Sequence, residues 1–246
     1  MALEGDRLVA VTGASRGLGR GCALAFAAQG AELALIARSA TDLAAVAEEV
    51  RCRGGRARVL ECDVTRDGQV RRAFESLDRC DVLINNAGTN FPQPFLEVDS
   101  ETLDALLTLN VRSMFVTAQA AARHMARARS GVIINMSSQM GHIGAPNRTV
   151  YCMTKHAVEG LTKAMAVELA PLGIRVNTVA PTYIETPMTR PFFENESFRE
   201  EVLSRIPLGR IGTIDEVVGA VRFLASPEAS LITGTSLIAD GGYTAQ

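Results

Sequence analysis

Three residues near the middle of the chain, Ser138, Tyr151 and Lys155, have the types and spacing needed to move a proton on or off an oxygen atom. Tyr151 and Lys155 lie four residues apart in a segment with a helical pattern, so the phenol and the ammonium share one helix face. A nearby cation favours the phenolate of tyrosine, whose ordinary pKa is about 10. Ser138 adds a neutral hydroxyl that can hold a carbonyl or alcohol oxygen beside the phenol. A Tyr-x-x-x-Lys pair also occurs by chance on helix surfaces, so the other motifs decide its meaning.

A glycine-rich turn near the N-terminus has the pattern of a nucleotide-binding turn. The apolar run at residues 8–12 predicts a buried parallel strand, and it leads into Gly13, Gly17 and Gly19 and then an alanine-rich helix that runs to residue 28. Strand, turn and helix form the first half of a βαβ unit in which the glycines let a pyrophosphate approach and the helix N-terminus favours its charge. We therefore expect a dinucleotide cofactor at this turn.

Two arginines indicate which dinucleotide binds. Arg16 lies in the opening turn of the helix, where a cation opposes the helix dipole and is better explained by an anionic ligand than by solvent exposure alone. Arg38 follows the second predicted strand, residues 31–37, where an acidic residue would bind the ribose hydroxyl of NAD. An arginine there accommodates the 2′-phosphate of NADP. We predict NADP(H) as the preferred cofactor, with NAD(H) as the alternative.

Polar residues also follow the third and fourth predicted strands, residues 57–62 and 82–85. Asp63 can accept a hydrogen bond from an adenine amino group or cap a helix that starts near Thr65, and both interpretations can hold together. The run Asn85-Asn86-Ala87-Gly88 indicates a turn that comes close to a ligand.

A long helical pattern at residues 100–128 contains one asparagine, Asn110, among apolar positions. A buried amide without partners is costly, so Asn110 must form hydrogen bonds. It either pins its helix to a neighbouring strand or holds a water next to the active site. The strand at residues 132–136 then delivers Ser138 to the edge at which open α/β sheets bind ligands.

Residues 181–212 interrupt the alternation of strands and helices with four prolines and several aromatic residues. A long irregular segment at the ligand edge predicts a substrate lid at about 182–212. Residues of this segment and of the loop before Tyr151 are expected to line the substrate pocket: Gln139, Gly141, His142, Arg148, Tyr183, Met188, Phe192 and Phe193. His142 and Arg148 suit a carboxylate, a phosphate or a hydroxyl-rich substrate, although such residues are also common on exposed loops.

The composition excludes several classes of function. In 246 residues, 25 basic and 27 acidic residues give a formal net charge of −2, which does not favour a nucleic-acid or anionic-membrane partner. No apolar run approaches the ~20 residues of a membrane span, and the N-terminus lacks a signal-peptide pattern, so we expect a cytoplasmic protein.

Cysteines and histidines give no metal or disulfide pattern. The cysteines are expected to be small buried residues in a reducing compartment, with Cys152, beside Tyr151, as a candidate reactive thiol; they are Cys22, Cys52, Cys62, Cys80 and Cys152. The histidines, His124, His142 and His156, lack metal-ligand spacing, so no catalytic metal is expected.

Seven strand patterns alternate with helical patterns along the chain. Beyond those described above, the last two strands are expected at residues 174–180 and 236–239, with a helix from about residue 215 to 225 between them. This order predicts a single α/β domain, residues 1–246, with a doubly wound parallel seven-stranded sheet of the Rossmann type and helices on both faces.

These motifs, in this order, resemble those of the NAD(P)(H)-dependent short-chain dehydrogenases/reductases, in the subgroup of about 250 residues. The matching residues, which span the whole chain, are Thr12-Gly13-x-x-x-Gly17-x-Gly19, Asn85-Asn86-Ala87-Gly88, Asn110, Ser138, Tyr151-x-x-x-Lys155 and Pro181. Ordered motifs at the right separations are far more specific than any one of them alone.

The resemblance implies a catalytic tetrad of Asn110, Ser138, Tyr151 and Lys155. Tyr151 would be the general acid in reduction and the general base in oxidation. Lys155 would hold the nicotinamide ribose and, together with an oxidised nicotinamide, lower the pKa of Tyr151. Ser138 would orient and polarise the substrate oxygen, and Asn110 would hold a water of the proton relay.

The resemblance also extends the cofactor site beyond the glycine turn. Asp63, Val64 and Asn86 would flank the adenosine, and Ile184 and Thr186 would hold the nicotinamide carboxamide. The complete expected set is Gly13, Ser15, Arg16, Gly17, Leu18, Gly19, Arg38, Asp63, Val64, Asn86, Ala87, Gly88, Tyr151, Lys155, Pro181, Ile184 and Thr186.

In one departure from the family pattern, Pro181 is followed by Thr182, where many relatives have glycine. A Cβ limits positive φ, so a slightly different loop path or nicotinamide pocket is expected. The resemblance further implies a homotetramer.

We therefore predict an NADP(H)-dependent oxidoreductase that interconverts a carbonyl and a secondary alcohol by hydride transfer. The chain looks most like bacterial 3-oxoacyl-carrier-protein reductases and related sugar or polyol dehydrogenases. Its candidate substrates are thus a 3-oxoacyl thioester, including one presented on a carrier protein, or a small keto or sugar compound. An NAD-dependent sugar or polyol dehydrogenase is the alternative within this class. A non-catalytic NADP-binding regulator is the alternative outside it, and the presence of Tyr151 and Lys155 weighs against it.

Overall fold

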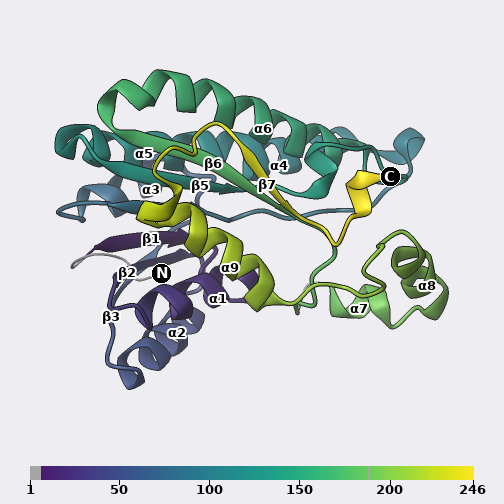
Figure 1. Ribbon diagram of the computed structural model, residues 1–246, viewed down its shortest axis with the longest axis horizontal. Coiled ribbons are helices and arrows are strands. Elements are labelled where there is room, and N and C mark those ends of the chain that lie inside the picture. Colours follow the sequence, from purple (N-terminus) through teal and green to yellow (C-terminus); the bar gives the residue numbers. More distant parts are fainter. Residues whose placement is uncertain (1–6, 188) are drawn as a thin grey trace.

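The computed structural model describes residues 7–187 and 189–246, and in this part of the chain seven parallel strands form one sheet (Figure 1). The strands lie in the order β3-β2-β1-β4-β5-β6-β7. Their bounds are β1 (Leu8–Thr12), β2 (Glu32–Ala37), β3 (Arg56–Glu61), β4 (Val82–Asn85), β5 (Gly131–Met136), β6 (Ile174–Pro181) and β7 (Ser236–Ala239). The chain reverses direction across the sheet between β1 and β4, so the predicted doubly wound Rossmann-type fold is confirmed.

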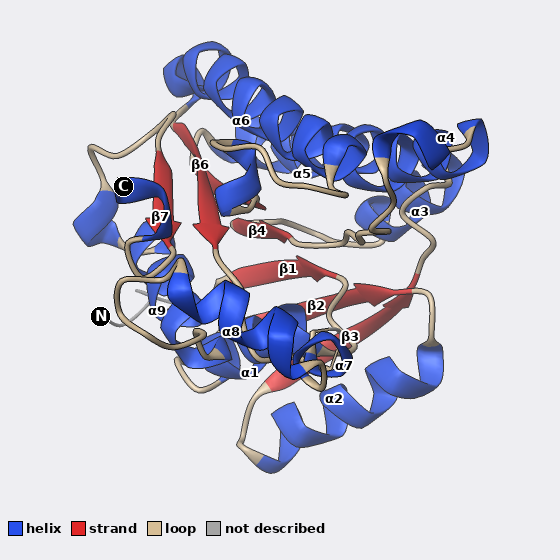
Figure 2. Cartoon of the chain, turned by 90° about the vertical axis from the view of Figure 1, so that its right-hand side faces the viewer, coloured by secondary structure: helices blue, strands red, loops and turns tan. Residues whose placement is uncertain are grey.

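Helices cover both faces of the sheet (Figures 1 and 2). One face carries α1 (Gly17–Ala27), α2 (Ala40–Cys52) and α9 (Ile214–Ala225). The other carries α3 (Asp67–Glu75), α4 (Ser100–Leu107), α5 (Ser113–Ala128) and α6 (Thr149–Leu169). Two short helices, α7 (Arg190–Phe193) and α8 (Glu196–Ser204), lie beyond the ends of the strands. Figure 2 looks toward this edge of the sheet.

The core consists of two apolar layers, one on each face of the sheet. Along β1, Val9 and Val11 join the layer that also contains residues of α1, α2 and α9, whereas Leu8 and Ala10 join the layer under α3 and α5. Successive side chains of a strand point to opposite faces, so a strand covered on both sides needs a continuous apolar run. This requirement explains why residues 8–12 are all buried.

The segment at residues 100–128 is one helical region with an unpredicted interruption. Between α4 and α5, residues Thr108–Arg112 form a π-helical turn, η2, in which Asn110 is fully buried. A π turn inserts one extra residue per turn and often marks a functional site. The turn therefore changes the direction in which Asn110 points relative to a regular α-helix.

The segment at residues 182–212, expected to be irregular, contains helices α7 and α8. Asn195 caps α8, because its side-chain Oδ1 accepts a hydrogen bond from the backbone N–H of Phe198 at 3.0 Å. Tyr183 packs edge-on against Phe193 and Phe198, with ring centroids 6.0 and 5.9 Å apart. The aromatic residues thus pack against one another and hold this segment together.

The remaining observations concern the cysteines, membrane spans and metal-ligating side chains. Cys22, Cys62, Cys80 and Cys152 are buried as expected, but Cys52 is exposed, because it is the last residue of α2 and faces away from the sheet core. Among the described residues, no helix is long and apolar enough to cross a bilayer. Nor does any group of three or more His, Cys, Asp or Glu side chains in residues 7–187 and 189–246 have an arrangement that could hold a metal ion.

Candidate active site

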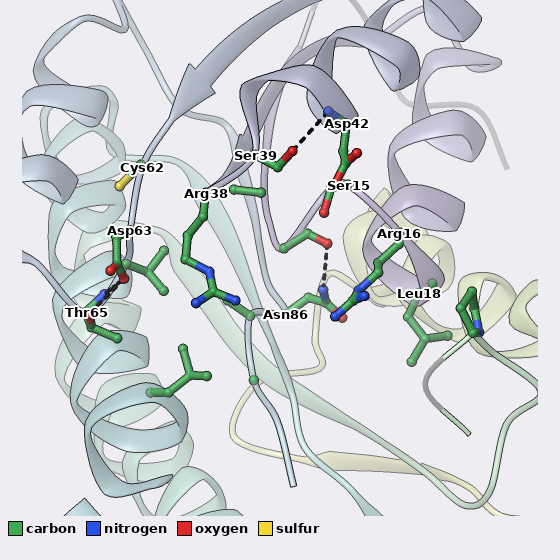
Figure 3. A pocket seen from close by; sticks show the side chains of 18 of the residues that line it. Ser15, Arg16, Leu18, Arg38, Ser39, Asp42, Cys62, Asp63, Thr65 and Asn86 are labelled. Atoms are coloured by element: carbon green, nitrogen blue, oxygen red, sulfur yellow. Dashed lines mark hydrogen bonds between the residues drawn. The ribbon is translucent and has the colours of Figure 1, made fainter. Parts of the chain in front are cut away.

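A cavity of about 690 Å³ opens at the carboxyl ends of β1 to β4 (Figure 3). This volume is within the range of small-molecule and cofactor sites. Most of the residues expected to bind the cofactor line it: Gly13, Ser15, Arg16, Gly17, Leu18, Arg38, Asp63, Val64, Asn86, Ala87, Gly88 and Thr186. The others, Gly19, Tyr151, Lys155, Pro181 and Ile184, do not line this cavity. The other lining residues, which were not predicted to bind the cofactor, are Ala37, Ser39, Asp42, Cys62, Thr65, Leu109 and Pro187.

The turn between β1 and α1 is tight enough to require glycine. Gly13 has φ +65°, and a Cβ there would lie 2.9 Å from Asn86 Nδ2. Gly19 is buried beside this turn, and a Cβ there would lie 2.2 Å from the carbonyl oxygen of Gly13. Gly17 has φ +56° and faces open space, with only Thr186 at 4.0 Å. The turn therefore presents bare backbone to the cavity at the N-terminus of α1, which fits a pyrophosphate.

Arg16 and Arg38 reach into the cavity from two sides (Figure 3). Neither guanidinium forms a salt bridge among the described residues and both are exposed, so both can meet an anion, although the Arg38 charge also acts on Asp63. Ser39 and Asp42 lie beside Arg38 at the start of α2, where the Ser39 hydroxyl accepts a hydrogen bond from the Asp42 N–H at 3.2 Å. The cavity thus has two cations at the end where the adenosine ribose of a dinucleotide would lie.

Asp63 lines the same cavity but does not cap a helix. Its Oδ1 accepts hydrogen bonds from the N–H and hydroxyl of Thr65 at 3.0 and 2.7 Å, which closes a turn, and α3 begins only at Asp67 after the N-cap residue Arg66. Burial acts to raise the pKa of the Asp63 carboxyl, but the Thr65 hydrogen bonds and the charges of Arg38 and Arg66 bring it below its usual value. The capping interpretation is wrong, and the ligand interpretation stays a prediction.

The turn after β4 is fastened to the glycine turn by Thr12. The Thr12 hydroxyl accepts hydrogen bonds from the N–H groups of Asn86 and Ala87 at 2.9 and 3.0 Å, and Asn86 Nδ2 donates to the carbonyl oxygen of Thr12 at 3.0 Å. Thr12 is fully buried. Its role was not predicted, because it depends on pairing between two turns more than 70 residues apart.

Asn110 joins three segments near the catalytic edge. Its Oδ1 accepts from the Thr89 N–H at 2.9 Å, and its Nδ2 donates to the Thr89 carbonyl at 2.8 Å and to the Thr154 hydroxyl at 3.2 Å. Asn110 thus pins its helix to the loop after β4 and to α6, rather than to a neighbouring strand. Gly88 lies against it, since a Cβ there would be 3.2 Å from Asn110 Oδ1. Asn110 therefore links the cofactor cavity to the helix that carries Tyr151.

The three residues of the proton-transfer pattern lie together. Ser138 follows β5, and Tyr151 and Lys155 lie on successive turns of α6. Lys155 Nζ donates to the carbonyl oxygen of Met136 at 2.8 Å and lies 5.5 Å from the centre of the Tyr151 ring. The Ser138 hydroxyl acts to lower the pKa of Tyr151, which means that it favours the phenolate.

Burial dominates the protonation of this group. It raises the pKa of Tyr151 to about 12, against the effects of Ser138 and Arg148, and it lowers the pKa of Lys155 to about 8. The expected low pKa of Tyr151 is therefore not a property of the chain alone. It requires additional positive charge, such as that of an oxidised nicotinamide.

Most of the described residues that were expected in the substrate pocket lie near Tyr151 or within the 182–212 segment. Arg148 precedes α6, and its positive charge acts to lower the pKa of both Tyr151 and Tyr183, although burial raises both. The charge of Arg148 therefore acts on both Tyr151 and the 182–212 segment, which carries Tyr183. Gln139 is 1% exposed, and Phe193 packs on Tyr183. Met188 and the side chain of Phe192 lie outside the described residues.

His142 is the exception, because its ring is held elsewhere. Its Nε2 lies 2.9 Å from the Ser236 hydroxyl and 3.3 Å from Glu159 Oε1. These contacts turn the imidazole toward the start of β7, whereas the ligand edge lies at the strand ends. His142 is therefore not free to bind substrate, and the sequence could not show this because Ser236 is 94 residues away.

Thr182, which follows Pro181 where many relatives have glycine, does not need the backbone freedom of glycine. Thr182 is not among the described residues with positive φ, and its N–H donates to the carbonyl oxygen of Ala239 at 3.1 Å. The loop after β6 continues alongside the end of β7 in an ordinary conformation. Ile184 then pairs with Gly212 at the far side of the 182–212 segment.

Known proteins are similar to the chain over its whole length. The family model described as Enoyl-(Acyl carrier protein) reductase matches residues 13–244. An L-xylulose reductase from Bos taurus is 39% identical, covering 100% of this chain and 99% of that protein. A 3-oxoacyl-(acyl-carrier-protein) reductase from Thermotoga maritima is 39% identical, covering 98% of this chain and 99% of that protein. A gluconate 5-dehydrogenase from Burkholderia cenocepacia, solved in complex with NADP and tartrate, is 35% identical with a TM-score of 0.95, covering 100% of this chain and 97% of that one.

A Rossmann-type sheet with a glycine turn, and a serine, a tyrosine and a lysine at its carboxyl edge, defines an oxidoreductase that acts on CH–OH or C=O groups with a nicotinamide dinucleotide. The full-length matches then show that the chain belongs to the short-chain dehydrogenase/reductase family. The family prediction and the prediction that the chain is an enzyme are both confirmed, so the regulator alternative loses its basis.

Proposed function

We propose that the chain transfers hydride between NADP(H) and a ketone or secondary alcohol, with Tyr151 as the general acid in reduction and the general base in oxidation. The observation that carries this proposal is the grouping of the Tyr151 phenol with Ser138 and a buried Lys155 ammonium. A bound nicotinamide supplies or accepts the hydride. Ser138 holds the substrate oxygen, and Tyr151 gives this oxygen a proton as it gains negative charge.

The other two members of the tetrad support Tyr151. Lys155 stabilises the phenolate that remains after proton transfer, which only a charged ammonium can do. Asn110 holds α6 and the loop after β4 in place through its hydrogen bonds to Thr154 and Thr89. In the proposed mechanism it also holds the water through which the proton is replaced. None of these side chains forms a covalent bond with the substrate.

We assign NADP(H) as the preferred cofactor on the basis of Arg16 and Arg38. Both line the cavity without an ion-pair partner in the described chain, and a guanidinium is well suited to a phosphate. Asp42 at the same end of the cavity is the one feature that favours a ribose hydroxyl instead. The complex of the gluconate 5-dehydrogenase with NADP supports the assignment.

We further propose that the substrate is a small hydroxyl-rich carbonyl compound rather than an acyl thioester. Both polar atoms of the Gln139 side chain are buried without a hydrogen-bond partner among the described residues, and Gln139 follows Ser138 directly. The Oδ1 of Asn90 and the Oε1 of Gln93 are buried in the same way, in a loop whose Gln93 N–H bonds to Asn147, beside Arg148. Buried polar groups without partners are costly, so a substrate that supplies hydroxyls gains their hydrogen bonds.

The test is oxidation of NADPH and of NADH at 340 nm against a carbonyl panel: keto sugars, small keto acids, simple diketones and a 3-ketoacyl thioester. We expect the highest kcat/KM with NADPH and a keto sugar or hydroxylated keto acid. Selective turnover of the thioester would instead place the chain with the acyl reductases. NADPH binding without turnover of any compound would contradict the proposed activity.

The expected homotetramer also remains a proposal. Phe115 on α5 and Met153 and Val167 on α6 are exposed apolar residues on adjacent helices of one face. Such a surface fits contact with a second copy of the chain. Light scattering on the purified protein distinguishes a tetramer from a 26.2 kDa monomer.

A further inference from the structure

One buried carboxylate near the candidate active site has no part in the mechanism above. Glu159 on α6 is only 6% exposed. It accepts hydrogen bonds from the Thr178 hydroxyl at 3.0 and 3.1 Å and from the Ser236 hydroxyl at 3.3 Å, and His142 Nε2 lies 3.3 Å away. In the described chain, Glu159 has no arginine partner and no salt bridge to lysine. A buried carboxylate held only by hydroxyls and an imidazole calls for a functional explanation.

The position of Glu159 on α6 relates it to Lys155. Glu159 lies four residues after Lys155, so the two side chains share the face of α6 that packs on the sheet. Gly141 packs tightly against this same turn, since a Cβ there would lie 3.1 Å from the Lys155 carbonyl oxygen and 3.2 Å from Glu159 Cγ. The segment that carries Ser138 is therefore pressed directly onto the Lys155–Glu159 turn.

Lys155 needs a negative charge nearby. It is 5% exposed, and its one hydrogen-bond acceptor in the described chain is the neutral carbonyl oxygen of Met136. An ammonium in such surroundings tends to lose its proton, because burial disfavours the charged form. A neutral amine would no longer stabilise the phenolate of Tyr151.

We propose that Glu159 is a positioning residue for the reaction: its buried carboxylate keeps Lys155 charged beneath Tyr151, while Thr178, Ser236 and His142 hold the carboxylate in place. The inference rests on the proposed function, in which Lys155 acts on Tyr151. Glu159 itself touches neither substrate nor cofactor.

The charges around this turn are few, which makes the assignment specific. On the face of α6 that packs on the sheet, the titratable groups of this turn are Lys155 and Glu159, with Tyr151 one turn before them. The other titratable residues of α6 are Cys152, His156, Lys163 and Glu168, of which His156, Lys163 and Glu168 are exposed. The Ser138 segment adds only the His142 imidazole. The strands β6 and β7 contribute neutral hydroxyls. Burial lowers the pKa of Lys155 to about 8, and Glu159 acts in the opposite direction. Removal of the Glu159 charge should therefore lower the pKa of Lys155 further.

The sequence offers an unusually direct way to measure this. The chain contains 25 basic residues, of which only Lys155 and Lys163 are lysines. Lysine labelled with ¹³C at Cε therefore gives two NMR signals in the full-length protein, and a Lys163→Arg variant assigns them. Lys163 is exposed on α6 and serves as an internal control. The titration is recorded for the wild type, Glu159→Gln, Glu159→Asp and Thr178→Val.

We expect Glu159→Gln to lower the pKa of Lys155 by about one unit or more, because the isosteric amide keeps the hydroxyl partners but removes the charge. Glu159→Asp keeps the charge and should restore most of the pKa. Thr178→Val removes a partner of the carboxylate without removing the charge, so its effect should be smaller. An unchanged Lys155 pKa in Glu159→Gln would overturn the proposal. If that variant does not fold, Glu159→Asp must still lower the pKa measurably, because it withdraws the carboxylate by one methylene.

A pH profile connects this measurement to turnover. If Glu159 acts through Lys155, the alkaline decline in kcat of Glu159→Gln shifts to lower pH by the same amount as the Lys155 pKa, and turnover at pH 6 stays close to the wild type. A loss of turnover that is equal at every pH would mean a merely structural role. The NMR titration needs no substrate, so it decides the Lys155–Glu159 coupling even if the wild type reduces none of the panel and the proposed activity fails.

Discussion

The two halves of the ligand edge hold their functional groups in opposite ways. At the ends of β1 to β4, the backbone determines the site: Gly13 and Gly17 adopt positive φ, Thr12 ties two turns together, and the charged groups, Arg16 and Arg38, are exposed. At the end of β5 and the start of α6, side chains determine the site, and Lys155 is buried, with a pKa well below its ordinary value. The half at the ends of β1 to β4, which we call the phosphate cradle, is open and charged. The half at the end of β5 and the start of α6, which we call the catalytic half because of its proposed role, contains a buried group that titrates.

The difference follows from what each half must do. A cradle for a phosphate needs charges that are always on and reachable, which exposed guanidiniums supply at every physiological pH. A proton-transfer site needs groups whose protonation can change near neutral pH, and burial is what shifts them. The use of lysine at position 155, in a chain where almost every other cation is arginine, agrees with this division.

The sharpest test of the catalytic half is Tyr151→Phe. It removes the oxygen that we propose gives or takes the proton and keeps the ring, so we expect kcat to fall on the order of a thousandfold. NADPH affinity, measured by fluorescence titration, should change little, because the cavity is lined by the other half. Tyr243→Phe, near the C-terminus, is the control for loss of a phenol elsewhere. Normal turnover of Tyr151→Phe would refute the mechanism.

The cradle is tested by adding a single methyl group. In Gly19→Ala the new Cβ would lie 2.2 Å from the Gly13 carbonyl oxygen, so backbone must move. We expect the free energy of unfolding in urea to fall by about 2–3 kcal/mol, with weaker NADPH binding in the protein that remains folded. Gly160→Ala on α6 is the matched control: nothing lies within 4 Å, and helix propensity predicts a gain of about 0.5–1 kcal/mol. Equal stability of the two variants would mean that the turn is not tight.

The charges of the cradle are tested by replacing Arg16 and Arg38 with alanine together. Loss of hydrogen bonds from charged groups to a phosphate typically costs about 1.5–3 kcal/mol, so the KM for NADPH should rise about 10- to 100-fold. The KM for NADH should rise far less, since NADH lacks the 2′-phosphate. Arg53→Ala, an exposed arginine at the other end of α2, should affect neither. An equal rise for both cofactors would rule out the NADP assignment.

The features that were predicted correctly from the sequence are those that short-range patterns determine. Residues 82–85 and 236–239 were assigned as strands with the bounds that β4 and β7 have, because short apolar runs between turn residues leave few alternatives. The i and i+4 spacing likewise brought Tyr151 and Lys155 to one face of α6.

What the sequence missed depends on distant partners. The π turn that carries Asn110 is accompanied by hydrogen bonds to Thr89 and Thr154, which lie 21 and 44 residues away. The bonds of His142 to Glu159 and Ser236 likewise overrode its local position beside the substrate loop. Burial of Tyr151 raised its pKa, where spacing alone suggested a lower one. Tertiary contacts and desolvation, rather than propensity, decide all of these features.

The smallest expected effect concerns the pH dependence of stability, and only the catalytic half should show it. Folding lowers the pKa of Lys155 from 10.5 to about 8, so between these values the unfolded chain binds more protons than the folded one. The contribution of Lys155 to the free energy of unfolding therefore rises with pH across this window, by about 1–2 kcal/mol between pH 7 and 9.5. Cysteines and tyrosines also titrate there, so the slope must be compared between variants.

Lys155→Met removes this contribution, whereas Lys163→Met, on the exposed side of the same helix, keeps it. Urea unfolding at pH 7, 8.5 and 9.5 should give the Lys163 variant the wild-type slope and the Lys155 variant a lower one. If both variants keep the wild-type slope, Lys155 stays protonated through this range and burial does not tune it. The contrast between an always-charged cradle and a titrating catalytic half would then fail at the residue on which it depends most.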